Sequence, residues 1–282
     1  MKKTIRIVVT VLLILVLLVG VGNLVMRGVQ ARENAQANAN AQQIVDLPDT
    51  SSPPLTEHPS PSVKPDPEPA AEPDPEPAFD DPYAQSLLET DLAELQAVNP
   101  DVLGWISIPD TPISYPLLQG EDNSYYLEHT WQKEYNPGGS IFMECQNNSD
   151  FSSFNTIIYG HRMSDSSMFN SLRHYENGEY LAQHPRIYIA ETDGVRVYEV
   201  FSACEVTVTD PVYWLITTQE KYKQAMIDFC IEQSVVDTGI VPDVEDRLLT
   251  LSTCTSMAVS DNRWVVIAVE VGMIERLPTE TE

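Results

Sequence analysis

Basic residues are scarce in this sequence. Lys and Arg number 16 among 282 residues, against 42 Asp and Glu, so the formal net charge is −26 at pH 7. A protein that binds DNA or RNA needs a basic surface to meet the phosphate backbone. The composition therefore excludes nucleic acid as an expected partner.

Cysteine is also scarce, with four residues at Cys145, Cys204, Cys230 and Cys254. They are too few and too widely spaced for a disulfide framework. No Cys-x-x-Cys pair and no Cys/His cluster points to a metal site. Cys204 lies in an alternating, strand-like run and Cys230 in a helix-like run, so both are expected to be small buried hydrophobic residues.

One long run without charge stands near the N-terminus, from Ile7 to Met26. A helix of that length rises about 30 Å, which is roughly the thickness of a bilayer's hydrocarbon core. Lys2, Lys3 and Arg6 before the run favour a cytoplasmic N-terminus. We expect residues 1–30 to be a cytoplasmic tip and a transmembrane anchor in the cell membrane, with the rest of the chain extracellular. A cleaved secretory signal is the alternative, although its apolar stretch is usually shorter, about 7–15 residues.

Residues 31–82 become rich in Pro, Glu and Asp, and the hexamer Pro-Asp-Pro-Glu-Pro-Ala occurs at 65–70 and again at 73–78. Such a segment buries too little apolar surface to offset its ordering entropy. We expect a disordered linker, which is either a stalk or a tether without a specific reach. Residues 83–282 hold nearly all the aromatic residues and are expected to form one domain.

Short strand-like runs separated by turn signals dominate this domain, which is therefore expected to be mainly β. They lie at 103–108, 113–118, 140–143, 156–160, 186–190, 195–208, 247–252 and 264–271. A helix at 83–98 precedes them, and a long helix at 218–233 lies between the sixth and seventh strands. Eight short strands separated by turn signals predict a closed or nearly closed eight-stranded β-barrel.

Two of these strands end in residues that can do covalent chemistry. The run from Arg247 ends at Cys254, and the run from Asn155 ends at His161. Arg263 opens the last strand, so a hairpin returns it toward Cys254. A cation there favours the thiolate and can hold the negative oxygen of a tetrahedral intermediate. Each residue alone is a weak signal, but the combination predicts a cysteine-dependent acyl-transfer site.

The sequence resembles the sortase family over about residues 85–272. The resemblance rests on Tyr159-Gly160-His161, Thr250-Leu251-Ser252-Thr253-Cys254 and Asn262-Arg263, which match the family signature in order and spacing. The Thr-Leu-Ser-Thr-Cys form, with a long helix ahead of it, is similar to class B. No second hydrophobic segment follows Val271, unlike the pilus-building class C enzymes.

The resemblance implies a sortase barrel in which Cys254 is the nucleophile, His161 the acid/base and Arg263 the oxyanion stabiliser. It also implies a substrate groove lined by Asn123, Leu127, Tyr159, Tyr213 and Ser252. Thr255 and the loop 210–214 depart from the pattern and leave the sorting motif open.

The implied reaction cleaves a C-terminal sorting signal of secreted proteins and transfers the acyl group to an amine of a peptidoglycan precursor or cross-bridge. Because two amides are exchanged, no cofactor is expected. Two alternatives remain at this point. A cysteine endopeptidase would use the same residues and let water resolve the acyl-enzyme, and a non-enzymatic cell-surface scaffold would use none of them.

Overall fold

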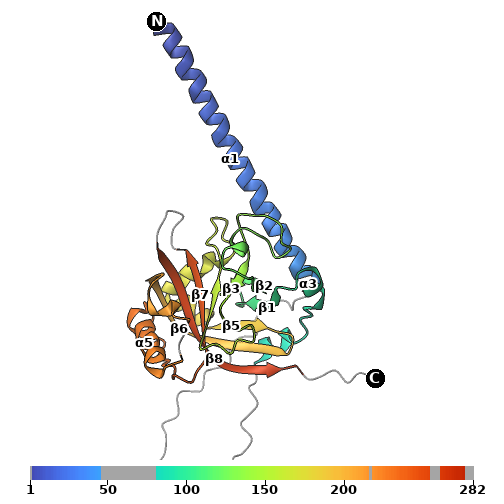
Figure 1. Cartoon of the computed structure of the whole chain (residues 1–282), viewed down its shortest axis with the longest axis vertical. Helices are drawn as coiled ribbons and strands as arrows, with labels where there is room; N and C mark the ends of the chain where they lie inside the picture. Colours follow the sequence, from blue (N-terminus) through green and yellow to red (C-terminus); the bar gives the residue numbers. More distant parts are fainter. Residues whose placement is uncertain (1, 46–80, 216–217, 255–260, 277–282) are drawn as a thin grey trace, which may run out of the picture.

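The computed structural model of the chain describes residues 2–45, 81–215, 218–254 and 261–276, with the backbone alone for residues 2–9, 11 and 254. Eight strands close into a barrel in the order β1-β2-β3-β4-β7-β8-β6-β5 (Figure 1). The strands are β1 (Val102–Ser107), β2 (Ser114–Leu118), β3 (Ile141–Met143), β4 (Asn155–Tyr159), β5 (Arg186–Ala190), β6 (Gly194–Thr207), β7 (Leu248–Cys254) and β8 (Asn262–Glu275). The predicted fold class, mainly β with an eight-stranded barrel, is confirmed.

The barrel is filled by aliphatic side chains, and every strand contributes at least one to a single buried cluster. The contributors include Ile106, Leu117, Ile141, Ile158, Ile189, Val200, Leu251 and Val266. Because successive side chains of a strand point to opposite faces, these residues fix which face of each strand turns inward. β4 and β7 are buried almost throughout, although both carry polar residues: the Thr250 hydroxyl of β7 donates to the Asn155 side-chain oxygen of β4 at 2.8 Å.

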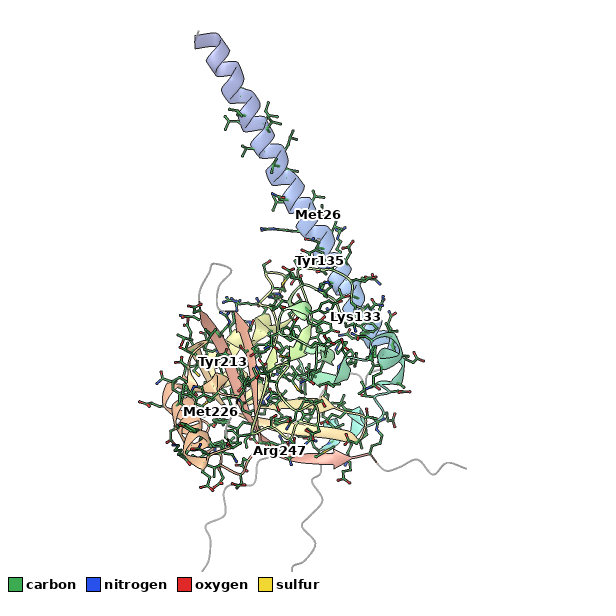
Figure 2. The ribbon with its side chains drawn as sticks, viewed as in Figure 1. Met26, Lys133, Tyr135, Tyr213, Met226 and Arg247 are labelled. Carbon is green, nitrogen blue, oxygen red and sulfur yellow. The ribbon has the colours of Figure 1, made fainter. Side chains whose placement is uncertain are left out.

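The long helix predicted between the sixth and seventh strands is α5 (Glu220–Gln233). Met226, labelled in Figure 2, and Cys230 are fully buried in a cluster with Cys204 of β6. Burial raises the pKa of the Cys204 thiol to about 11 and raises that of Cys230 as well. Both cysteines are therefore inert core residues, as expected.

The predicted single helix at 83–98 is instead two short helices, α2 (Pro82–Leu87) and α3 (Ala93–Val98). The second helix has Leu92 as its N-cap, and just before it the Asp91 carboxylate accepts a hydrogen bond from the Ala93 N–H in a local turn that separates the two helices. The structure also contains the helix α4 (Gly178–Gln183), which we did not predict, and three 3₁₀ helices, η1 (Tyr125–Leu127), η2 (Phe169–Glu176) and η3 (Pro211–Tyr213).

The N-terminal helix α1 spans Lys2–Val45 and so extends beyond the apolar run. Ala37, Ala41 and Val45 recur at intervals of four and are buried against the domain. The Trp131 indole N–H donates to the carbonyl of Ala37 at 2.7 Å. The expectation of a disordered linker is therefore wrong for residues 31–45. Their Ala-rich composition favours helix, and the domain supplies the packing surface.

The apolar part of α1 stands clear of the domain, up to and including Met26 (Figures 1 and 2). It is long and apolar enough to cross a membrane, and none of its most apolar window is buried. The central linker residues, 46–80, lie outside the described part of the chain. Val45 and Asp81, which flank them, are each 3% exposed in the same folded unit. The Pro-rich segment therefore joins two points of one unit.

Candidate active site

Three adjacent strands bring the predicted reactive positions to one end of the barrel. β4 runs parallel to β7 with Tyr159 opposite Ser252, and the Gly160 N–H donates to the Ser252 carbonyl at 3.1 Å. His161, which follows β4, therefore lies beside the end of β7. β7 and β8 are antiparallel, and Cys254 is directly paired with Arg263. The predicted return of Arg263 toward Cys254 is confirmed for the backbone, while the Cys254 side chain and Thr255 lie outside the described part.

The approach to His161 depends on Gly160. A Cβ on Gly160 would come within 2.5 Å of the Ile141 Cδ1 atom and 2.7 Å of the Phe169 Cδ2 atom, both in the core. The Phe169 N–H also donates to the His161 carbonyl at 2.9 Å. The chain therefore passes tightly over the core just before it presents the imidazole.

The imidazole of His161 is held by a backbone carbonyl. Its Nε2 atom lies 2.7 Å from the carbonyl oxygen of Leu127. A carbonyl can only accept, so Nε2 must carry the proton of this bond. Nδ1 is then the nitrogen left for proton transfer.

Arg263 is held by its neighbours at the start of β8. Its Nη1 donates to the Asn262 carbonyl at 3.0 Å, and the Asn262 side chain donates to the Glu205 carboxylate of β6 at 2.7 Å. Arg263 is partly exposed, and a guanidinium offers a planar fork of hydrogen-bond donors.

A cavity of about 390 Å³ lies at this end of the barrel. Every predicted site residue whose side chain is described lines it, namely Asn123, Leu127, Tyr159, His161, Tyr213, Ser252 and Arg263. Figure 2 labels Tyr213, and its hydroxyl lies 2.7 Å from the Ser252 hydroxyl. Four lining residues were not predicted: Phe142, Gly160, Val208 and Thr253. Of these, Gly160 and Thr253 were visible in the sequence as parts of the two motifs.

Behind the cavity wall lies Glu144, which sequence reasoning missed. It is 3% exposed and accepts hydrogen bonds from Asn123 at 2.6 Å and from the Tyr159 hydroxyl at 2.9 Å. Burial and the Glu144 charge raise the pKa of Tyr159, so that hydroxyl stays protonated and donates. The available signal was a carboxylate directly after a predicted strand. Within the described residues, no group of three or more His, Cys, Asp or Glu could hold a metal ion.

The chain matches the family model described as "Sortase domain" over residues 106–271. It is 39% identical over 170 residues to Sortase B of Listeria monocytogenes, covering 58% of this chain and 67% of that protein. It is 30% identical over 187 residues to Sortase B of Staphylococcus aureus, covering 66% of this chain and 77% of that protein.

Solved structures agree. A sortase B–substrate complex from Staphylococcus aureus superposes with a TM-score of 0.60 at 32% identity, covering 65% of this chain and 84% of that one. Sortase B from B. anthracis, in complex with AAEK1, superposes with a TM-score of 0.65 at 27% identity, covering 86% of this chain and 98% of that one. The motif match, the barrel and these relatives agree, and this chain belongs to the sortase family, class B, whose members are cysteine transpeptidases.

Proposed function

We propose that this protein cleaves a C-terminal sorting signal of secreted proteins and joins the new carboxyl end to an amine of peptidoglycan. The observation that carries the proposal is the convergence of three adjacent strands. β4, β7 and β8 place His161, Cys254 and Arg263 at one end of the barrel, beside a cavity large enough for several residues of a peptide.

In the first half-reaction the Cys254 thiolate attacks the carbonyl carbon of the scissile amide. A C–S bond forms, and the carbonyl oxygen becomes an oxyanion that the Arg263 guanidinium stabilises. As the intermediate collapses, the C–N bond breaks and His161 protonates the departing amine. The Leu127 carbonyl holds Nε2–H, so Nδ1 is the nitrogen that gives up this proton. A thioacyl-enzyme remains.

In the second half-reaction an incoming amine attacks the thioester. His161 accepts the proton that the amine loses, a C–N bond forms, and the C–S bond breaks to return the thiolate. One amide is exchanged for another, so the two steps balance without an oxidant, a reductant or a nucleotide.

We place the enzyme in the cell membrane, with α1 as its anchor, the N-terminus in the cytoplasm and the catalytic domain outside. The exposed apolar run and the docked residues of α1 belong to one helix. Only eight residues, a rise of about 12 Å, separate Met26 from Asn34, whose side chain donates to the Gly139 carbonyl. The domain would then sit close to the membrane surface.

Product analysis tests the proposal. Full-length protein in detergent is incubated with a set of sorting-signal peptides, with and without a peptidoglycan-like amine, and the products are identified by mass spectrometry. The expected result is a new amide between the N-terminal fragment and the amine. Hydrolysed fragment alone, at every amine concentration, identifies a cysteine endopeptidase. No cleavage of any peptide overturns both readings.

A further inference from the structure

Glu144 is a buried carboxylate beside the active-site cavity, and it is not one of the three residues of the proposed mechanism. It directly follows β3 and is 3% exposed. Burying a charge is costly unless the charge is well partnered. Within the described part of the chain its partners are hydrogen-bond donors, and none of the ion pairs there involves it.

The two carboxylate oxygens accept from different groups. Oε2 accepts from the Asn123 side-chain amide at 2.6 Å and from the Tyr159 hydroxyl at 2.9 Å. Oε1 accepts from the Gln146 N–H at 3.2 Å and from the Cys145 thiol at 3.4 Å. An ionised carboxylate is an acceptor only, and hydrogen bonds to it are stronger than those between neutral groups. The Oε2 pair is the functionally important one, because Asn123 and Tyr159 both line the cavity.

These hydrogen bonds fix which groups of the cavity wall can donate and which can accept. The Asn123 amide is held at both ends, since its nitrogen donates to Glu144 and its oxygen accepts from the Cys145 N–H at 2.8 Å. The amide therefore cannot flip, and its second N–H takes part in neither of these two hydrogen bonds. The Tyr159 hydroxyl donates its hydrogen to Glu144, so toward the cavity the hydroxyl oxygen can only accept a hydrogen bond.

We propose that Glu144 is a positioning residue for the substrate: it holds Asn123 and Tyr159 in one orientation and so sets which donors and acceptors the groove offers a sorting peptide. The inference rests on the proposed function of the cavity. It gives Glu144 no contact with the reacting atoms, so Glu144 should affect peptide recognition and leave the reactivity of Cys254 unchanged.

The test compares Glu144→Gln with the wild type in full-length protein, using the best sorting-signal peptide. In the variant a nitrogen replaces one acceptor oxygen, so the two donors bonded to that oxygen lose their acceptor and the other two are left with an uncharged one. We expect KM to rise about tenfold, the equivalent of one hydrogen bond to a charged group, with little change in kcat. Alkylation of Cys254 by iodoacetamide does not depend on hydrogen bonds to the cavity wall, so its rate should stay at the wild-type value. Glu176→Gln, an exposed carboxylate outside the cavity, is the matched control and should change neither.

A double-mutant cycle shows whether Glu144 acts through Asn123. In an Asn123→Ala background, Glu144→Gln should raise KM much less than it does in the wild type. An equal effect in both backgrounds, an unchanged KM in Glu144→Gln, or a parallel loss of alkylation rate would overturn the proposal.

Should Glu144→Gln fail to fold, Tyr159→Phe, Asn123→Ala and their double mutant decide the question. The two residues share one carboxylate oxygen, so their effects on KM should be less than multiplicative, and full independence contradicts the inference. Absence of turnover in the wild type overturns the proposed function itself, whereas normal turnover with no response to these variants overturns only the role of Glu144.

Discussion

Replacing Gly160 with Ala tests how the barrel presents His161. The new Cβ would lie 2.5 Å from the Ile141 Cδ1 atom and 2.7 Å from the Phe169 Cδ2 atom, where ordinary contact begins at 3.4 Å. The Phe169 ring would have to move by the difference, about 0.7 Å, in a core where it is fully buried. Overpacking of this kind costs about 1–3 kcal/mol.

The same displacement reaches the catalytic group, because the Phe169 N–H is bonded to the His161 carbonyl. A misplacement of about 1 Å at a catalytic residue lowers the rate by about 10²-fold. We therefore expect Gly160→Ala to lower kcat/KM by about two orders of magnitude. At about 2–4 °C per kcal/mol for a domain of this size, the melting temperature should fall by roughly 4–8 °C for a cost of 2 kcal/mol.

Gly178→Ala is the matched control. Gly178 begins α4 with no atom within 4 Å of the added Cβ, and its φ is not positive. This substitution should raise stability by about 0.4–1 kcal/mol and leave kcat/KM unchanged. Peptide turnover and thermal unfolding followed by tryptophan fluorescence measure both quantities. If Gly160→Ala melts and turns over like the wild type, the steric account of the histidine's placement is refuted.

Two further predictions concern Arg263 and the docking of α1. Arg263→Ala should lower kcat by about 10²–10³-fold, as loss of an oxyanion donor does, and Arg263→Lys should recover only part of the lost kcat because the charge returns without the planar fork. The control is Arg173→Ala, which removes an exposed arginine outside the cavity. Equal kcat values in all these variants would contradict the assignment. Ala41→Glu places a charge on the buried face of α1 and should speed hydrogen exchange in residues 34–45, whereas Ala35→Glu, on the exposed face, should leave the exchange rate unchanged. Identical exchange rates in the two variants would contradict the docking of α1.

The barrel was predictable because its strands are apolar runs closed by turn residues. The strand at 186–190 was predicted with the bounds that β5 has, and the long helix at 218–233 began only two residues before α5. The register of β4 beside β7 was not predictable, because the two strands are far apart in the chain. Their neighbouring ends could be inferred only from the chemistry of the residues at those ends.

Two of the misses, residues 31–45 and Glu144, have a common physical cause, which is that tertiary contacts decided them. Residues 31–45 resemble a polar linker, and only the surface that receives Ala37, Ala41 and Val45 makes them a docked helix. Glu144 looked like an ordinary charge at a strand end, since its donors come from Asn123, distant in sequence, and from Tyr159 on the next strand. The lining residues Asn123, Leu127, Tyr159, Tyr213 and Ser252 were placed by resemblance and are brought together at the cavity.

The central claim is that Cys254 carries the acyl group between the two half-reactions. Intact-mass analysis of the full-length protein, quenched with acid during turnover of a sorting-signal peptide, tests it most directly. We predict an adduct with the mass of the N-terminal peptide fragment, localised to Cys254 and discharged by added amine. Cys254→Ala should show no adduct and no cleavage while keeping the wild-type melting temperature. Cleavage by a folded Cys254→Ala protein, or an adduct on another residue, would contradict the account.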